Sequence, residues 1–276
     1  MTITLAENYG FCFGVKRAIK IAEENQNSRT YGPLIHNAKE IERLQRDYNV
    51  GLTENLNDFQ AGDTVVIRTH GIPKNELQEL YARGVNVIDA TCPYVTKPQQ
   101  ICEDMSQQGY DIVIFGDEQH PEIKGVQSYA EDRVFTLLHV EELEMLRLRD
   151  KVALVAQTTR HVEEFLKIAN ALIANHKEVR VFNTICNATF ENQDAVRKLA
   201  KNSDVMIIIG GKNSSNTKQL HAISVNECSE SYHIESCNEL QAQWFENKEK
   251  CGVSAGASTP DWIILQVCER IASMRS

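Results

Sequence analysis

The sequence predicts an α/β fold built from three small lobes of similar pattern. Short apolar strands alternate with helical patterns along almost the whole chain, which is typical of βαβ units with mainly parallel sheets. The strands recur in sets, with the same kind of junction in each third of the chain. We therefore expect one lobe over residues 13–92, a second over 93–186, and a third formed by 187–276 together with 1–12.

Each expected lobe contains two strands that run directly into a polar loop. Because the carboxyl ends of parallel strands meet at one edge of a sheet, ligands bind there in open α/β folds. Each lobe should therefore present two polar loops at one edge. The loops follow strands at residues 32–37 and 69–71 in the first lobe, 116–122 and 157–159 in the second, and 210–216 and 252–258 in the third.

Three of the eight cysteines share one setting, at the point where an apolar strand ends and a helix begins. Cys12 follows a short strand pattern at residues 3–5 and precedes an amphipathic helical stretch. Cys92 and Cys186 follow strands of the same kind. Three such turns could aim three sulfurs at one point, so the sequence outlines a site for a metal cluster.

Composition and charge exclude several functional classes. The formal net charge is −9 and no run of Lys or Arg follows one face, so a nucleic-acid surface is not expected. The longest apolar stretches, such as residues 205–209, are far too short to span a membrane, and the amino terminus has no secretion signal. We therefore expect a cytoplasmic protein with no membrane segment.

The cysteine spacing argues against a structural zinc site. Without a secretion signal, eight cysteines favour reduced thiols, and no CxxC pair occurs. Structural zinc usually takes ligands from such close pairs. Cys102 and Cys268 lie inside expected helices, where a small buried thiol is the ordinary interpretation.

The polar loops carry side chains suited to an anion. His36, His70 and His120 all fall at strand ends, and glycine-rich turns nearby let backbone N–H groups approach a phosphate. Charge-assisted hydrogen bonds contribute about 1.5–3 kcal/mol each, so several donors could hold a diphosphate without an arginine clamp. The same loops also contain Glu122, Thr158, Ser214, Ser215, Asn216 and Ser258.

Seven motifs extend over nearly the whole chain: GFCFGVKRA (10–18), DATCPYVTK (89–97), HPE (120–122), QTT (157–159), IC (185–186), GKNSSN (211–216) and SAGASTPD (254–261). In identity and in order, these motifs resemble those of the 4-hydroxy-3-methylbut-2-enyl diphosphate reductase (IspH/LytB) family. The resemblance implies three α/β lobes in a pseudo-three-fold trefoil around a central iron–sulfur cluster.

The resemblance also implies a role for each matched residue. Cys12, Cys92 and Cys186 would hold one 4Fe-4S cluster whose fourth iron has no cysteine ligand and acts as a Lewis acid. Glu122, Thr158 and His120 would be catalytic, with Glu122 as the proton source. The implied substrate-binding residues are His36, His70, His120, Ser214, Ser215, Asn216 and Ser258.

The implied reaction is the last step of the non-mevalonate (MEP) isoprenoid pathway. The hydroxylated diphosphate would lose its hydroxyl group as water, with two electrons and two protons consumed, to give isopentenyl diphosphate and dimethylallyl diphosphate. The implied partner is an electron donor, ferredoxin or flavodoxin. One departure stands near Cys186, because the family commonly has an Arg-Gln pair where this chain has Asn192 and Gln193.

Two other classes remain open from the residues alone. A non-catalytic iron–sulfur sensor would need the three sulfurs but gives no reason for Glu122 and the anion loops. A hydrolase or transferase with a cysteine nucleophile and a histidine base would need only one sulfur. A dinucleotide-binding fold is not expected, because Gly210-Gly211 lacks the spaced glycine fingerprint.

Overall fold

The computed structural model describes residues 1–274 and confirms the α/β fold class. Its twelve strands in this range form three sheets of four strands, and every strand pair is parallel. Sheet A contains β1 (Thr2–Leu5), β12 (Lys250–Ala255), β10 (Val205–Ile209) and β11 (Ser231–Ile234), in that order. Sheet B contains β5 (Asn86–Asp89), β4 (Thr64–Ile67), β2 (Arg29–Tyr31) and β3 (Gly51–Thr53). Sheet C contains β9 (Glu178–Val181), β8 (Lys151–Ala156), β6 (Asp111–Phe115) and β7 (Val134–Leu137).

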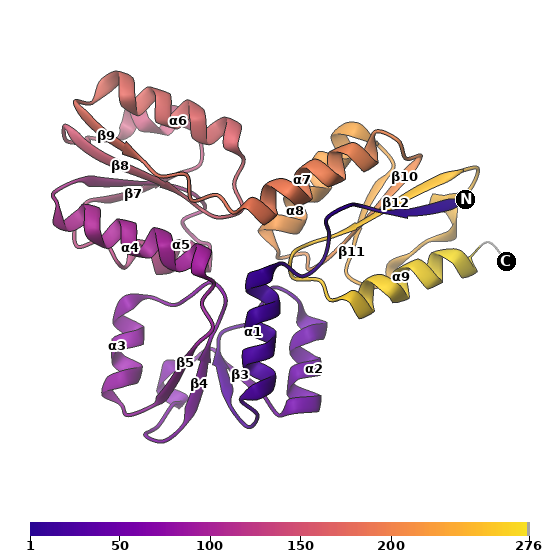
Figure 1. Cartoon of the computed structure of the whole chain (residues 1–276), viewed down its shortest axis with the longest axis horizontal. Helices are drawn as coiled ribbons and strands as arrows, with labels where there is room; N and C mark the ends of the chain where they lie inside the picture. Colours follow the sequence, from indigo (N-terminus) through magenta and orange to yellow (C-terminus); the bar gives the residue numbers. More distant parts are fainter. Residues whose placement is uncertain (275–276) are drawn as a thin grey trace. The chain divides into compact units, whose positions relative to one another are not determined.

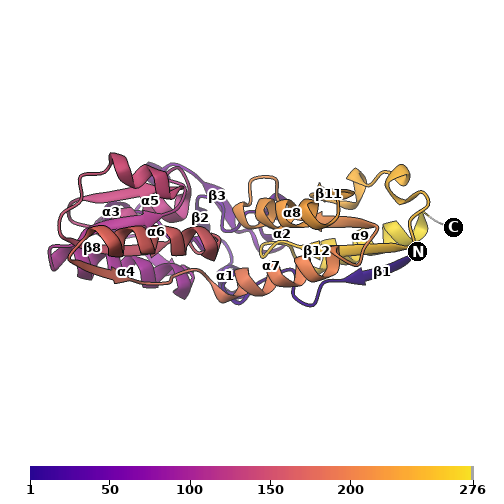
Figure 2. The same cartoon turned by 90° about the horizontal axis from the view of Figure 1, so that it is seen from above.

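The three sheets share one topology, which gives the predicted repeat its structural form. One edge strand of each sheet leads to a cysteine, and it pairs with the same neighbour in the repeat. These pairs are β1 with β12, β5 with β4, and β9 with β8. Each predicted lobe contains the strands of one sheet, since β1 joins the carboxy-terminal strands in sheet A. Figure 2 shows β1 running beside β12. The lobe boundaries themselves stay a prediction.

Nine α-helices lie within the described residues, and they connect the parallel strands. Their bounds are α1 Phe13–Glu24, α2 Ala38–Tyr48, α3 Lys74–Ala82, α4 Pro93–Gln107, α5 Pro121–Gln127, α6 Val162–Asn175, α7 Asn187–Ala200, α8 Ser215–Glu227 and α9 Asp261–Ser273. Short 3₁₀ helices replace an α-helix in the connections β3–β4, β7–β8 and β11–β12, at Leu56–Asp58, Val140–Met145, Cys237–Glu239 and Ala242–Phe245.

Sheet A shows how the helices bury both faces of a sheet. Strand β10 is fully buried, and its side chains alternate between two apolar clusters. Ile207 and Ile209 pack with Ile263 and Val267 of α9. The even-numbered side chains of β10 pack with α7 and α8 on the other face, and Figure 1 shows β10 between these helices and α9.

Two of the expected buried thiols differ in exposure. Cys102 is fully buried in α4, as predicted, and burial raises its pKa to about 12. Cys268 lies in α9 as expected but is only half-buried, because the buried stripe of this helix is formed by Ile263, Ile264 and Val267 with Ile271. No disulfide links the eight cysteines, all of which fall within the described residues.

The described chain packs as two compact units. Unit 1 consists of residues 1–16, 35–43 and 187 onward and contains sheet A; unit 2 consists of residues 17–34 and 44–186 and contains sheets B and C. The short segment 35–43 therefore packs with sheet A, although the strand before it belongs to sheet B.

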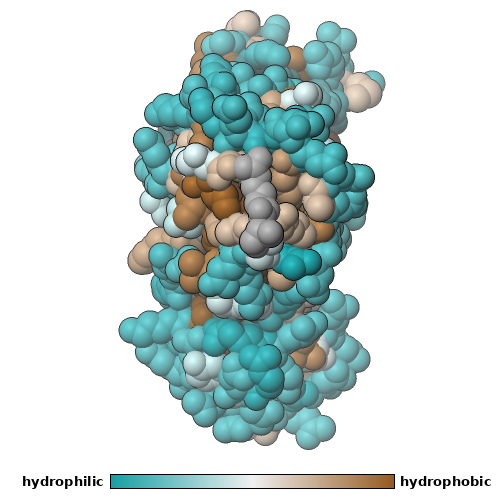
Figure 3. Space-filling model, turned by 90° about the vertical axis from the view of Figure 1, so that its right-hand side faces the viewer, coloured by the Kyte–Doolittle hydropathy of each residue, from teal (hydrophilic) through white to brown (hydrophobic). Residues whose placement is uncertain are grey.

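The face drawn in Figure 3 is mostly hydrophilic, with apolar residues in separate patches, in keeping with a charged fraction of 24%. Among residues 1–274, no helix combines the length and the apolar character needed to cross a membrane.

Candidate active site

The three predicted cysteines occupy equivalent positions in the repeat. Each directly precedes the first residue of a helix, α1, α4 or α7, and each is half-buried. Each also donates its backbone N–H to a carbonyl in the loop after the neighbouring strand, which fixes the turn. The three bonds are Cys12 to Ala257 at 3.2 Å, Cys92 to Thr69 at 3.0 Å and Cys186 to Thr158 at 2.9 Å.

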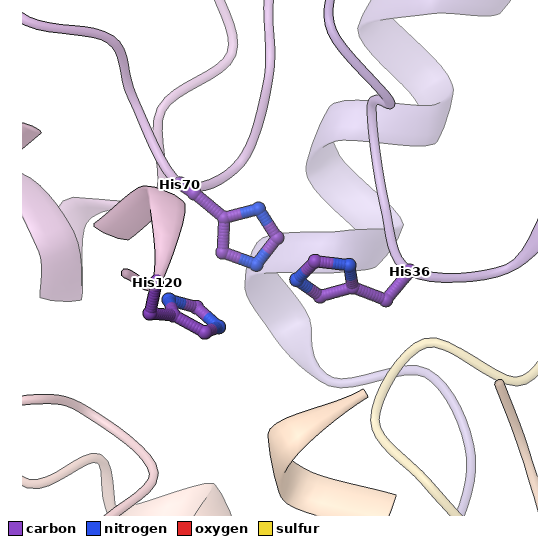
Figure 4. A group of neighbouring side chains, drawn as sticks. All are labelled: His36, His70 and His120. Atoms are coloured by element: carbon purple, nitrogen blue, oxygen red, sulfur yellow. The ribbon is translucent and has the colours of Figure 1, made fainter. Parts of the chain in front are cut away.

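In unit 2, two of the predicted histidines lie together. The rings of His70 and His120 meet edge to face with their centroids 5.5 Å apart, as Figure 4 shows. His70 follows Thr69, whose carbonyl binds the Cys92 amide. The third labelled histidine, His36, belongs to unit 1. The loops after β4, β5 and β6 thus converge within this unit.

His120 is oriented by its position at the start of a helix. It is the N-cap of α5, and its Nδ1 accepts the backbone N–H of Glu122 at 3.2 Å. In the neutral imidazole the proton must then lie on Nε2, which leaves this nitrogen as a hydrogen-bond donor. The arrangement suits recognition of an anion by His120.

Glu122 is buried and bound by Thr158 through both carboxylate oxygens. Its exposed fraction is 1%. The Thr158 backbone N–H donates to Oε1 at 2.7 Å, and the Thr158 hydroxyl donates to Oε2 at 2.8 Å. Burial raises the pKa of Glu122, while the two Thr158 hydrogen bonds and the Arg160 charge act against the shift. A carboxyl group in this setting keeps its proton to higher pH than an exposed glutamate, as a proton donor requires.

Arg160 is part of this site and was not singled out from the sequence. Its Nε donates to Oε1 of Gln157 at 3.0 Å, and the same oxygen accepts the backbone N–H of Asp117 at 3.0 Å. The guanidinium also lies over the Phe115 ring, 5.8 Å from its centroid. Its place directly after the Gln157-Thr158-Thr159 motif was a signal, but a single sequence gives no reason to prefer it over other arginines.

In unit 1, the loop after β10 forms an anion site in outline. Ser214 is the N-cap of α8, where its hydroxyl accepts the Thr217 N–H at 3.3 Å. Asn216 is only 6% exposed, and neither atom of its amide has a hydrogen-bond partner within residues 1–274. An unpaired buried amide is costly, so Asn216 is suited to bind a ligand together with the helix N-terminus.

The remaining unit 1 residues come from two neighbouring loops. Ser258 lies in the loop after β12, where the Gly256 N–H and the Thr259 hydroxyl both donate to the Ile209 carbonyl, at 2.8 and 3.0 Å. The Cys12 amide binds the Ala257 carbonyl of the same loop. These bonds place Cys12 and Ser258 beside the end of β10.

His36 lies against the loop that follows β10. A side chain on Gly211 would clash with the carbonyl oxygen of His36, so glycine is required for this close approach. Lys212, next in the loop, directs its ammonium group to the His233 carbonyl and to Glu239 at 3.5 Å. The backbone of the loop, rather than this lysine, therefore faces His36.

The departure near Cys186 falls on a buried face of α7. Asn192 and Gln193 are each 6% exposed, and Gln193 Nε2 donates to Gln219 Oε1 of α8 at 3.2 Å. In this chain, Asn192 is buried in α7, and Gln193 links α7 to α8.

The predicted site residues are divided between the two units. Cys92, Cys186, His70, His120, Glu122 and Thr158 belong to unit 2, and Cys12, His36, Ser214, Ser215, Asn216 and Ser258 belong to unit 1.

The chain is similar to named enzymes over its full length. It is 68% identical over 271 residues to the 4-hydroxy-3-methylbut-2-enyl diphosphate reductase of Sulfurimonas denitrificans, covering 98% of each chain. It is 55% identical over 275 residues to the enzyme of that name from Campylobacter jejuni, covering 100% of this chain and 99% of that one.

Two solved structures show the same fold. A structure of (E)-4-hydroxy-3-methyl-but-2-enyl diphosphate reductase, described as the terminal enzyme of the non-mevalonate pathway, matches with 43% identity and a TM-score of 0.74, covering 99% of this chain and 100% of that one. The E-1-hydroxy-2-methyl-but-2-enyl-4-diphosphate reductase from Plasmodium falciparum matches with 26% identity and a TM-score of 0.90, covering 97% and 86%. The model of the LytB protein family matches residues 3–272. By sequence and by fold, this chain belongs to the LytB protein family.

Proposed function

We propose that this chain reduces 4-hydroxy-3-methylbut-2-enyl diphosphate to isopentenyl diphosphate and dimethylallyl diphosphate, the reaction that ends the non-mevalonate pathway. The observation that carries the proposal is the buried Glu122–Thr158 pair. Thr158 binds the proton donor through its side chain and backbone N–H, and its carbonyl binds the amide of Cys186. Proton delivery and a sulfur ligand thus meet at one residue. The enzyme would be an oxidoreductase, as its relatives are.

Members of the family bind an iron–sulfur cluster, and we assign a 4Fe-4S cluster to Cys12, Cys92 and Cys186. The donor set fits, because clusters of this kind are held by cysteine thiolates and these three residues occupy equivalent turns. With three cysteine ligands for four irons, one iron would remain open to a further ligand. When bound, the cluster supplies electrons one at a time and a Lewis-acidic iron for the departing hydroxyl group.

In this proposal, the diphosphate is bound by donors in the polar loops that follow the strands. His120 offers Nε2–H, and the buried amide of Asn216, which has no hydrogen-bond partner within the described chain, offers its NH₂ group beside the N-terminus of α8. None of these groups is an arginine, so affinity depends on several hydrogen bonds to the charged oxygens. The full set assigned to the substrate is His36, His70, His120, Ser214, Ser215, Asn216 and Ser258.

Glu122 serves as the acid of the reaction. The allylic C–O bond breaks, and the oxygen leaves with the bonding electron pair and takes up a proton to become water. The allylic carbon skeleton takes up two electrons and a second proton, which gives the alkenyl diphosphate product. Hydroxide is a poor leaving group, so the first proton must be available where the bond breaks. The Thr158 hydroxyl, hydrogen-bonded to Glu122, positions that proton.

The electrons come, in this proposal, from a ferredoxin or a flavodoxin in the cytoplasm. The reaction needs two electrons, and a 4Fe-4S cluster passes one at a time, so the donor must deliver twice in each turnover. Neither nucleic acid nor a membrane is needed for the activity.

An anaerobic turnover assay tests the function directly. The purified protein is incubated with the hydroxylated diphosphate and a chemical one-electron reductant such as reduced methyl viologen, and the products are separated. Formation of both isopentenyl and dimethylallyl diphosphate is expected. Reductant oxidation without these products, or hydrolysis of the diphosphate, would contradict the proposal and favour the cysteine-nucleophile class.

Replacement of Arg160 by glutamine is expected to shift the pH dependence of kcat. The Arg160 charge lowers the pKa of Glu122, so its removal raises that pKa. Because Glu122 must be protonated to donate, activity falls as pH rises through its pKa, and the alkaline limb of the profile should move to higher pH. Arg160→Lys keeps the positive charge, so the alkaline limb of its pH profile should lie closer to that of the unsubstituted protein. An alkaline limb that stays fixed, or moves to lower pH, would show that Arg160 does not act on Glu122.

A further inference from the structure

Glu40 is a buried carboxylate with a complete set of partners in unit 1. It is 1% exposed. Arg43 donates to Oε1 through Nε at 2.9 Å and Nη2 at 2.6 Å, and the indole N–H of Trp262 donates to Oε2 at 3.0 Å. A buried carboxylate is retained only when such bonds compensate its lost hydration. The bond to Trp262 spans 222 residues of sequence.

The two ends of this bond lie just after two of the proposed diphosphate loops. Glu40 is in the first turn of α2, four residues after His36, and its backbone N–H donates to Oδ1 of Asn37 at 3.1 Å. Trp262 is the second residue of α9, four residues after Ser258. The bond therefore joins the His36 loop to the Ser258 loop across elements from different sheets.

A second contact fixes the same segment. The His36 carbonyl packs against Gly211, where a Cβ has no room. Residues 35–43 thus meet the loop after β10 at one end and α9 at the other, which accounts for their place in unit 1, whereas sheet B belongs to unit 2. The position of His36 is set by these contacts, since strand β2 ends five residues earlier, at Tyr31.

We propose that Glu40 and Trp262 are positioning residues that hold His36 beside the Ser258 and Gly211 loops, so that the diphosphate meets these donors already assembled. The inference rests on the proposed function, because it takes His36 and Ser258 as diphosphate ligands. Preassembled donors bind an anion without first losing conformational freedom, so the pair acts on affinity more than on the chemical step.

The test is the affinity of the anaerobically purified holoenzyme for its substrate and for inorganic diphosphate. Trp262→Phe keeps an aromatic ring but removes the N–H donor. We expect the dissociation constants for both anions to rise about tenfold, as for loss of one buried charge-assisted hydrogen bond, with kcat changed less than about twofold. Glu40→Gln retains an oxygen that can accept the indole N–H of Trp262, so this variant should keep most of the affinity of the unsubstituted protein. Glu40→Ala has no such oxygen and should lose affinity as Trp262→Phe does.

Trp244→Phe is the matched control. Trp244 also lies in unit 1 and stacks on Tyr232 at 4.0 Å, remote in sequence from the diphosphate loops. The Trp244→Phe variant should bind the substrate and inorganic diphosphate as tightly as the unsubstituted protein does. If Trp262→Phe lowers the melting temperature but binds both anions normally, the pair is only structural and the inference is wrong. Failure of the unsubstituted holoenzyme to bind either anion would overturn the proposed function instead.

Discussion

Serine in place of Cys12, Cys92 or Cys186, one at a time, is expected to remove the visible colour of the anaerobically purified protein and reduce turnover more than about a thousandfold. The three residues hold equivalent positions, each at the start of a helix with its N–H bound to the neighbouring loop. A serine hydroxyl replaces the thiolate poorly as a ligand for a cluster iron. The loss should therefore be similar at all three sites.

The remaining cysteines provide the control for this prediction. Cys237 and Cys268 are half-buried like the three proposed ligands, but Cys237 begins a 3₁₀ helix after β11 and Cys268 lies within α9, so neither occupies the turn that the three proposed ligands share. Their serine variants should keep colour and activity. One essential thiol among the three, in a protein without colour, is the pattern of a cysteine nucleophile and would contradict the cluster assignment.

Replacement of Glu122 by glutamine is expected to reduce kcat about 10²–10⁴-fold and to leave the cluster assembled. Glutamine has nearly the same shape, and its oxygen can still accept the Thr158 N–H. It has no proton to transfer at accessible pH, so the acid catalysis is lost. Absorbance and iron content should equal those of the unsubstituted protein, because Glu122 is not a proposed iron ligand.

Glu118→Gln is the matched variant for this comparison. Glu118 lies in the same loop after β6 but is exposed. The Glu118→Gln variant should therefore have the activity of the unsubstituted protein. A Glu122→Gln variant with nearly full turnover would show that another group supplies the proton. A variant that loses its colour would instead show that Glu122 supports the cluster.

The sequence predicted the elements of the site because the signals were local. A strand pattern followed by a cysteine or a polar loop marks a strand end, and all three cysteines indeed precede a helix directly. The three-lobe repeat was visible for the same reason, since each sheet is assembled from neighbouring segments except for β1. The strand order that the three sheets share could not be predicted from the sequence and became known only from the structure.

The contacts that support the site could not be predicted, because they join distant segments. Nothing in the sequence links Glu40 to Trp262, and the requirement for glycine at position 211 comes from the His36 carbonyl far away in the chain. Arg160 was missed because its effect on Glu122 depends on how the β6 and β8 loops meet. Such positioning residues follow from packing rather than from a local pattern.

The most direct test of the central claim is a count of iron and acid-labile sulfide in the anaerobically purified protein, with its visible spectrum followed as the hydroxylated diphosphate is added. We expect a brown protein with about four irons per chain and a spectrum that shifts with substrate, as an open iron in the cluster requires. A colourless protein that gains no cluster on anaerobic reconstitution would contradict the account.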